Sequence, residues 1–180
     1  MIAPTETPTT KTIVMAGGCF WCMESPFDAT DGVISTVSGY SGGHLDNPTY
    51  KDVSGGASGH IEVLQVTYDP SKVTLERLLD IFWRNIDPLD GGGQFCDRGD
   101  QYRSALFYVD DAEKAVMEAS KAKHEAIVGD QIVTELLPAA PFYAAEDYHQ
   151  DYYLRNPVRY KYYRYRCGRD ERLQELWAGK

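Results

Sequence analysis

The sequence has little of what marks secreted, membrane-bound or nucleic-acid-binding proteins. It holds only four cysteines in 180 residues, far fewer than a small secreted disulfide scaffold carries, so catalytic or redox use of these cysteines is favoured over stapling. Its 18 lysines and arginines are outnumbered by 27 aspartates and glutamates, which gives a net charge of −9. This balance argues against a protein that binds nucleic acid by neutralising phosphates.

Long apolar stretches are also missing. No segment approaches the roughly 18 apolar residues that a membrane span needs, and the N-terminus lacks a basic region followed by an apolar core. We therefore expect no contact with membranes and a cytoplasmic location. The length of 180 residues predicts a single domain with a sizeable core. We expect this catalytic domain to work as a monomer, with a flexible lead-in over residues 1–10 and a tail over about 155–180.

Hydrophobic periodicity predicts the elements of this domain. Strands are expected at 11–16, 33–39, 60–68, 102–109 and 131–136, and helices after Cys19 and at 74–85, 110–128, 145–154 and 168–177. Pro26 should kink the first helix or begin a second one. The order predicts an α+β fold, a two-layer sandwich with a mixed sheet and an irregular C-terminal tail. Residues 39–58 form a long Gly-rich loop, which in a compact domain is more often functional than idle.

The stretch Gly17-Gly18-Cys19-Phe20-Trp21-Cys22 concentrates chemistry at one strand-to-helix turn. A helix N-terminus lowers a cysteine pKa from about 8.5 to roughly 3.5–7.5 and favours the nucleophilic thiolate. The glycines allow close approach, and two aromatic residues stand beside the sulfur. A lone buried cysteine is usually a small hydrophobe, but this combination predicts a reactive thiol at Cys19.

The strand at 60–68 carries a carboxyl group on an apolar face. Glu62 alternates with Leu64, Val66 and Tyr68. A carboxyl desolvated by such neighbours has a raised pKa and remains a neutral proton donor. The alternative is that Glu62 points to solvent at the strand end, and the strand alone does not decide between the two.

Several kinds of chemistry remain open on these residues. Cys19 and Cys22 form a Cys-x-x-Cys pair, typical of thiol-disulfide oxidoreductases. A zinc site is disfavoured because Cys96 and Cys167 stand alone and the four histidines lack ligand spacing. A cysteine hydrolase, in which a histidine meets Cys19 in space, is not excluded. The basic and tyrosine-rich segment 159–166 is interpreted as a clamp that holds the tail on an acidic body, in preference to an RNA contact or a redox-regulated binding surface.

Five separated motifs, in order over roughly residues 12–157, make the chain resemble peptide methionine sulfoxide reductase, type A. They are Gly18-Cys19-Phe20-Trp21, Asn47-Pro48-Thr49-Tyr50, Gly59-His60-Ile61-Glu62, Gln101-Tyr102-Arg103-Ser104 and Ala145-Glu146-Asp147-Tyr148-His149-Gln150. The resemblance implies a ferredoxin-like α+β core. It also implies reduction of the S-epimer of methionine sulfoxide, free or in proteins, without metal or organic cofactor.

The resemblance also implies roles for individual residues. Cys19 corresponds to the nucleophile that attacks the sulfoxide sulfur, and Glu62 to the acid that protonates the sulfoxide oxygen, with help from the hydroxyls of Tyr50 and Tyr102. The remaining matched positions are substrate-binding: Phe20, Trp21, Asp97 and Tyr152. Attack leaves a sulfenic acid on Cys19, which another thiol converts to a disulfide that thioredoxin or a similar dithiol reduces.

The resolving thiol is where this chain departs from many relatives, which have glycine at the position of Cys22 and recycling cysteines in a glycine-rich tail. Cys22 is close to Cys19 along the chain, whereas Cys167 requires the tail to swing inward. Both are candidates, with Cys96 third. A general disulfide oxidoreductase acting through Cys19 and Cys22 is the rival enzyme.

Overall fold

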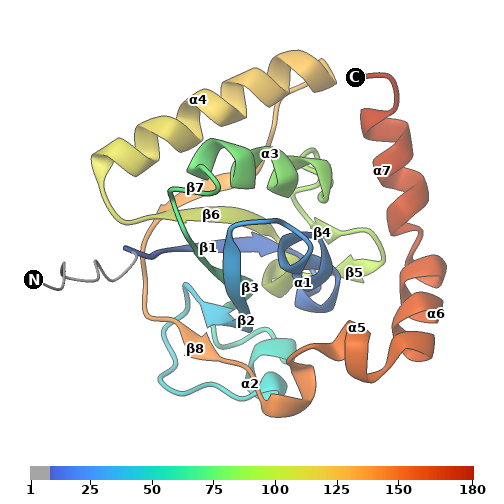
Figure 1. The fold of residues 1–180 in the computed structure, drawn as a ribbon. Helices are drawn as coiled ribbons and strands as arrows, with labels where there is room; N and C mark the ends of the chain where they lie inside the picture. Colours follow the sequence, from blue (N-terminus) through green and yellow to red (C-terminus); the bar gives the residue numbers. More distant parts are fainter. Residues whose placement is uncertain (1–8) are drawn as a thin grey trace, which may run out of the picture.

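The computed structural model describes residues 9–180 and is built on a six-stranded sheet (Figure 1). The strand order is β7-β6-β1-β3-β2-β8, and neighbours are antiparallel except β6 and β7, which are parallel. The strands are β1 Lys11–Gly17, β2 Val33–Ser41, β3 Ile61–Tyr68, β6 Ser104–Tyr108, β7 Glu135–Pro138 and β8 Tyr143–Ala144. The predicted α+β fold with a mixed sheet is confirmed. The expected lead-in over 1–10 falls mostly on residues 1–8, outside the described residues, and stays a prediction.

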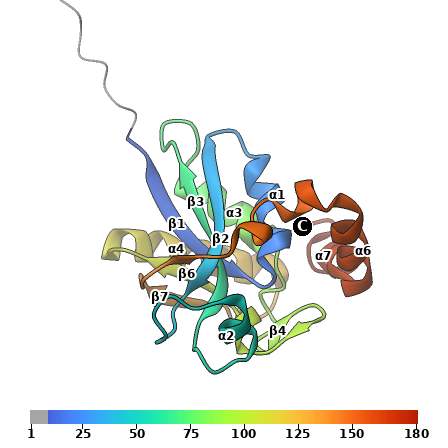
Figure 2. The same ribbon diagram turned by 90° about the horizontal axis from the view of Figure 1, so that it is seen from below.

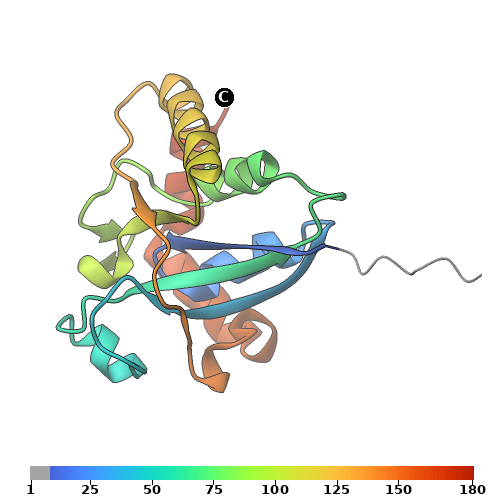
Figure 3. The same cartoon turned by 90° about the vertical axis from the view of Figure 1, so that its left-hand side faces the viewer.

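Four helices cover one face of this sheet: α1 Phe20–Asp28, α3 Leu75–Arg84, α4 Asp111–Val128 and α7 Arg169–Trp177. Alternate residues of β1, β3 and β6, among them Met15, Leu64 and Leu106, are fully buried against them. The opposite face carries a smaller cluster around Val63 and Phe107, covered by residues 137–142. Figure 3 shows α3 and α4 on one side of the strands. No helix among residues 9–180 is long and apolar enough to cross a membrane.

Local capping chemistry fixes the helix boundaries where the sequence predicts them. The hydroxyl of Thr74 accepts the backbone N–H of Arg77 at 3.1 Å, at the start of α3. The carboxylate of Asp110 accepts the N–H of Glu113 at 2.8 Å, at the start of α4. That helix ends at Gly129, whose φ of +80° is the left-handed conformation favoured by glycine.

Of the two outcomes expected at Pro26, the second helix is wrong and the kink stays a prediction. A second helix does not begin at Pro26; α1 runs unbroken from Phe20 to Asp28 with the proline inside it. Pro26 lies in the last turn of α1, so the missing N–H removes a single helical bond there. The unbroken helix keeps Cys22 and Phe20 on a rigid element.

Two loops contain structure that the sequence reading missed. Residues 39–58 include a short helix, α2 Tyr50–Ser54, started by a capping box in which Thr49 and Asp52 bond each other reciprocally. Residues 87–100 contain a small hairpin of β4 Gly93–Gln94 and β5 Asp97–Arg98. The strand expected to begin at Tyr102 begins at Ser104, because Tyr102 ends the 3-10 turn Asp100–Tyr102.

The tail is helical, which corrects the expectation of an irregular segment before the terminal helix. It consists of α5 Tyr152–Arg155, α6 Pro157–Cys167 and α7, and Figure 2 shows α6 and α7 beside α1. Polar contacts hold it on the body: Arg172 donates to Asp87 at 2.9 Å and Tyr153 donates to Asp28 at 2.7 Å. Both contacts come from outside segment 159–166, and within it Arg164 pairs with Asp170 and Arg166 bonds Tyr162, both in the tail itself, so the clamp assigned to this segment stays a prediction.

Candidate active site

Cys19 and Cys22 are both free thiols, and both are buried at the start of α1. The turn between β1 and α1 is tight because Gly18 has a φ of +83° and a Cβ there would lie 2.5 Å from Gln94. Gln94 itself is fixed by two hydrogen bonds to the backbone of Asp87. The hairpin that carries Gln94 therefore contacts the turn between β1 and α1, and only glycine fits at position 18.

The two thiols affect each other's pKa. The pKa of Cys19 is raised, whereas the sequence predicts that it is lowered. Burial, and next the hydrogen bond with Cys22, raises the pKa of Cys19 well above its usual value. The hydrogen bond from Cys19, helped by the positive charges of Arg169 and Arg164, lowers the pKa of Cys22 to about 6. Of the two thiols, Cys22 therefore ionises more readily and Cys19 less readily than an ordinary cysteine.

Glu62 lies beside the nucleophile and is buried. The backbone N–H of Phe20, the residue after Cys19, donates to Glu62 Oε2 at 3.2 Å, and only 3% of the residue is exposed. Burial raises the pKa of Glu62 to about 8, with further contributions from Asp97 and Cys22. The solvent-exposed alternative is wrong: at neutral pH this carboxyl is a neutral acid.

The two predicted tyrosines lie within the electrostatic influence of Glu62. Tyr50 begins α2 and Tyr102 ends the 3-10 turn before β6, and each phenol affects the pKa of the other. Burial and then the charge of Glu62 raise the pKa of both phenols. Both therefore remain hydrogen-bond donors near Glu62 at any physiological pH.

Trp21 is enclosed by aromatic residues from the tail. Its indole stacks on Tyr152, with ring centres 3.8 Å apart and planes 8° from parallel, and the edge of Tyr163 faces it at 5.8 Å. Its ring N–H donates to His149 Nδ1 at 3.1 Å. Because Nδ1 accepts, the single proton of His149 is on Nε2, and burial lowers the pKa of this histidine and keeps it neutral.

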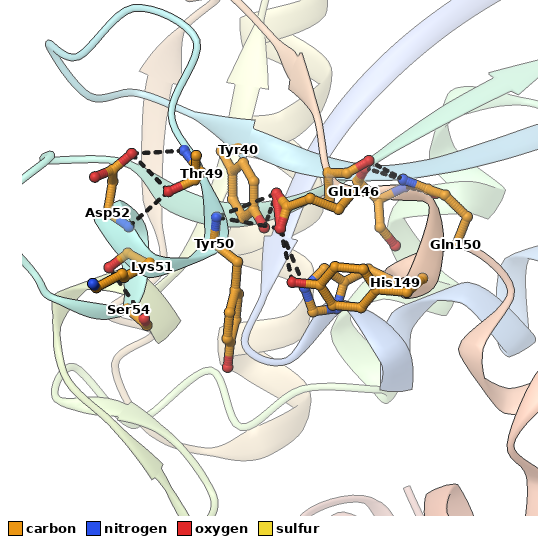
Figure 4. Close-up of polar contacts among 12 residues, drawn as sticks. Tyr40, Thr49, Tyr50, Lys51, Asp52, Ser54, Glu146, His149 and Gln150 are labelled. Carbon is orange, nitrogen blue, oxygen red and sulfur yellow. Dashed lines mark hydrogen bonds and ion pairs between the residues drawn. The ribbon is translucent and has the colours of Figure 1, made fainter.

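Glu146, which precedes the helical tail, holds the tyrosine side of the site together (Figure 4). Its carboxylate accepts the backbone N–H of Tyr50 at 3.2 Å, the hydroxyl of Tyr40 at 3.3 Å and the hydroxyl of Tyr148 at 3.0 Å. Tyr40 pairs with Glu62 across β2 and β3. One carboxylate thus fixes where α2 begins and, through it, the Tyr50 ring.

Asp97 and the remaining two cysteines lie at the α6 side of the site. The hydroxyl of Tyr163 donates to the Asp97 carboxylate, and burial raises the pKa of Asp97. Next to it, Cys96 and Cys167 form a disulfide. Cys167 is therefore bonded to Cys96 in this form of the protein, and Cys22 is the free thiol beside Cys19.

The predicted site residues come from separate parts of the chain and lie around the β1–α1 turn, and several of their partners were not predicted. His149, Glu146 and Tyr40 hold the predicted residues in place, and Tyr163 and the Cys96–Cys167 disulfide lie beside them. The motif around His149 was noticed, but sequence gave no reason to pair it with Trp21. No pattern linked Cys96 to a cysteine 71 positions away.

Comparison with known proteins agrees with this geometry. The family model described as "Peptide methionine sulfoxide reductase" matches residues 11–180. The chain is 49% identical over 167 residues to peptide methionine sulfoxide reductase MsrA of Bacillus licheniformis, covering 92% of each protein. It is 50% identical over 173 residues to MsrA 2 of Caulobacter vibrioides, covering 96% of this chain and 88% of that protein.

Solved structures give the same result. The reduced form of Mxr1 from Saccharomyces cerevisiae superposes with a TM-score of 0.79 and 37% identity, covering 83% of this chain and 87% of that one. Methionine sulfoxide reductase A of Corynebacterium diphtheriae superposes with a TM-score of 0.75 and 36% identity, over 85% and 78% of the two chains. The chain therefore belongs to the peptide methionine sulfoxide reductase family.

Proposed function

We propose that this chain reduces the S-epimer of methionine sulfoxide, free or within proteins, with Cys19 as nucleophile and Glu62 as proton donor. The observation that carries the assignment is the buried, neutral Glu62 carboxyl bonded to the N–H that follows Cys19. A sulfoxide oxygen is a poor leaving group until it is protonated, so a thiol and a neutral acid are needed side by side.

Attack begins with a proton shift inside the thiol pair. Cys19 passes its proton to the Cys22 thiolate, to which it is already hydrogen-bonded, and the Cys19 sulfur bonds to the sulfoxide sulfur. Glu62 gives its proton to the sulfoxide oxygen, and the hydroxyls of Tyr50 and Tyr102 stabilise the developing charge. The hydroxyl then passes from the substrate sulfur to the Cys19 sulfur as the bond between the two sulfur atoms breaks, which leaves methionine and a sulfenic acid on Cys19.

The wall for the substrate methyl group is aromatic. Phe20 is buried beside Tyr40, at 5.9 Å between ring centres, and Trp21 is held by Tyr152 and His149. We assign Phe20 and Trp21 to the methyl pocket and Tyr152 to its outer side. Asp97 fixes the Tyr163 ring against Trp21, which gives it a positioning role.

Resolution is assigned to Cys22. The Cys22 thiol attacks the sulfenic sulfur of Cys19, a disulfide forms and water leaves. Cys22 is the free thiol already hydrogen-bonded to Cys19, whereas Cys167 is bonded to Cys96.

An external dithiol of the thioredoxin type completes the cycle. A structure described as Mxr1 from Saccharomyces cerevisiae in complex with Trx2 resembles this chain with a TM-score of 0.58 and 28% identity, which supports this part of the proposal. We also propose a single catalytic domain that works as a monomer. A cytoplasmic location, where such dithiols are kept reduced, belongs to the same proposal.

Paired substrates test the function. Peptides carrying the S- or the R-sulfoxide and a small disulfide substrate are given to the parent protein and to Cys19→Ser. The proposal expects reduction of the S-sulfoxide by the parent and its loss in Cys19→Ser. Equal reduction of both epimers contradicts the stereochemical assignment, and preferential reduction of the disulfide favours the rival disulfide oxidoreductase.

A further inference from the structure

The first residue of α7 is a buried arginine. Arg169 opens this helix, yet only 2% of its surface is exposed. A positive charge at a helix N-terminus opposes the helix dipole, and a buried charge costs free energy unless an opposite charge lies near it. The placement of Arg169 therefore does not serve the stability of α7 itself, and its charge requires a partner elsewhere in the molecule.

The guanidinium of Arg169 contacts both sides of the turn between β1 and α1. Its Nη2 donates to the backbone oxygen of Gly17 at 3.1 Å and lies 3.3 Å from the sulfur of Met23. Gly17 is two positions before Cys19. Met23 directly follows Cys22. The two residues that flank the thiol pair thus hold the same buried positive charge beside it.

No carboxylate is bonded to this arginine in the part of the chain that the structure describes. A further bond of Arg169 is to the backbone oxygen of Asn85 at 2.6 Å, its Cζ lies 4.6 Å from the centre of the Phe95 ring, and its buried Nε has no hydrogen-bond partner. Asp97 is within reach of the charge of Arg169, but its carboxylate accepts the hydroxyl of Tyr163. The charge of Arg169 is therefore available to an anion that forms nearby.

Cys22 is the group near Arg169 that gains such a charge. The hydrogen bond from Cys19 is the main cause that lowers the pKa of Cys22 to about 6, against the effect of burial, and the charge of Arg169 is the next favourable cause. That hydrogen bond changes when the thiol of Cys19 is oxidised to a sulfenic acid. An arginine side chain is not deprotonated in proteins, so the charge of Arg169 persists through the whole cycle.

We propose that Arg169 is a positioning residue for the resolving step, in which its buried charge holds the sulfur of Cys22 as the thiolate that attacks oxidised Cys19. The proposal rests on the function proposed above and deepens it, because it names the group that equips Cys22 for resolution. In this step the Cys22 sulfur bonds to Cys19 Sγ, and the bond between sulfur and oxygen in the sulfenic acid breaks. The proton that Cys22 gives up leaves with the hydroxyl as water.

The other charged and titratable groups around Cys22 do not replace this charge. They are Cys19 before α1, Glu62 in β3, Asp97 in β5, and Tyr160, Tyr163 and Arg164 in α6. The thiol, the carboxyls and the phenols add only negative charge when they ionise. Arg164 is paired with the carboxylate of Asp170 through Nε and Nη2. Arg169 is thus the cation beside Cys22 that no bonded carboxylate neutralises.

Titration of the Cys22 thiolate tests the assignment. Cys19→Ser leaves Cys22 as the single free thiol, because the other two cysteines are joined in a disulfide. The thiolate is then measured by its ultraviolet absorbance, which the protonated thiol lacks. Adding Arg169→Gln removes the charge but keeps a donor for the neighbouring backbone oxygens. It should raise the midpoint of the titration by roughly one pH unit or more.

Two further variants separate charge from structure, each made in the same Cys19→Ser protein. Arg169→Lys keeps a positive charge and should return the midpoint most of the way to that of Cys19→Ser alone. Arg166→Gln removes an exposed arginine that bonds Tyr162 within α6 and should leave the midpoint unchanged. A purely structural arginine predicts a lower Tm for Arg169→Gln with the same midpoint, and that result overturns the proposal.

The pH profile of resolution is a second measurement, and it needs no substitution. The parent protein is mixed with one equivalent of S-sulfoxide peptide without reductant, the reaction is stopped with acid, and mass spectrometry counts the sulfenic acid and the Cys19–Cys22 disulfide. Disulfide formation should be half-maximal at least about one pH unit below 8.5, the value of an ordinary thiol. A half-maximum at about 8.5 or above overturns the role of Arg169 and leaves the proposed function standing. No methionine at any pH overturns the proposed function itself.

Discussion

The backbone N–H of Phe20 donates to the carboxyl of Glu62 at 3.2 Å, across 42 positions of sequence. This bond joins the first turn of α1, next to the thiols, to the start of β3, which carries the acid. Because the carboxyl is buried, the bond fixes its orientation without making it ionise at neutral pH. The relationship places a proton donor next to the nucleophile before substrate arrives, as acid catalysis requires.

Glu62→Gln should slow single-turnover methionine formation by roughly tenfold or more, because the amide keeps the bond to Phe20 but has no proton to transfer. In the parent protein the rate should fall as pH rises through about 8, where Glu62 ionises. Glu118→Gln, on the exposed side of α4, is the matched control. A Glu62→Gln rate equal to that of the parent across this range removes Glu62 from the chemistry.

The same carboxyl affects stability in a defined pH window. Its pKa is raised from 4.5 to about 8, so between these values the folded state holds a proton that the unfolded state has lost. The contribution of this carboxyl to the free energy of unfolding is fully present below pH about 4.5 and is lost as pH rises through about 8. In thermal unfolding followed by circular dichroism, the Tm of Glu62→Gln should increase relative to that of the parent as pH rises across this window. Parallel melting curves would show that the carboxyl is not desolvated.

Tyr50→Phe and Tyr102→Phe should each slow reduction by roughly tenfold to a hundredfold, because each loses a donor near the sulfoxide oxygen. Since each phenol affects the pKa of the other, the double variant should lose less than the product of the two single losses. Stopped-flow single-turnover rates for the four proteins measure this coupling. Strictly multiplicative losses would mean that the phenols act independently.

Glu24 is expected to hold the outer wall of the methyl pocket. It accepts the hydroxyl of Ser38 and the N–H of Asp151, each at 2.8 Å, and Asp151 precedes Tyr152 with a left-handed φ of +53°. Glu24→Ala should raise KM about fivefold, the loss of roughly 1 kcal/mol of hydrogen bonding, and leave the maximal single-turnover rate near that of the parent. Glu24→Gln, whose amide still meets both partners, should restore KM. Failure of this rescue contradicts a positioning role.

Much of the framework could be predicted because it depends on local rules. The strand that carries Glu62, the cap at Thr74 and the glycine end of α4 follow from alternation, hydroxyl capping and backbone freedom within a few residues. The helical tail was less accessible: α6 is stabilised by long-range contacts such as Tyr163 with Asp97, and its own sequence has no apolar stripe.

The electrostatics of the thiol pair required the fold. Because Cys19 stands at a helix N-terminus, its sequence position suggests that it is the thiolate. Burial and the hydrogen bond to Cys22 instead raise the pKa of Cys19, while the pKa of Cys22 is lowered. Arg164 and Arg169, which favour the Cys22 thiolate, come from the far end of the chain. The Cys96–Cys167 disulfide likewise joins two segments that no spacing rule connects.

The most direct test of the account is mass spectrometry of Cys22→Ser after one turnover with the S-sulfoxide peptide. The account predicts one methionine per chain and one added oxygen atom on the Cys19 peptide, trapped as a sulfenic acid because the resolving thiol is gone. Methionine formed with no oxygen on Cys19, or formed by Cys19→Ser at the parent rate, would contradict it.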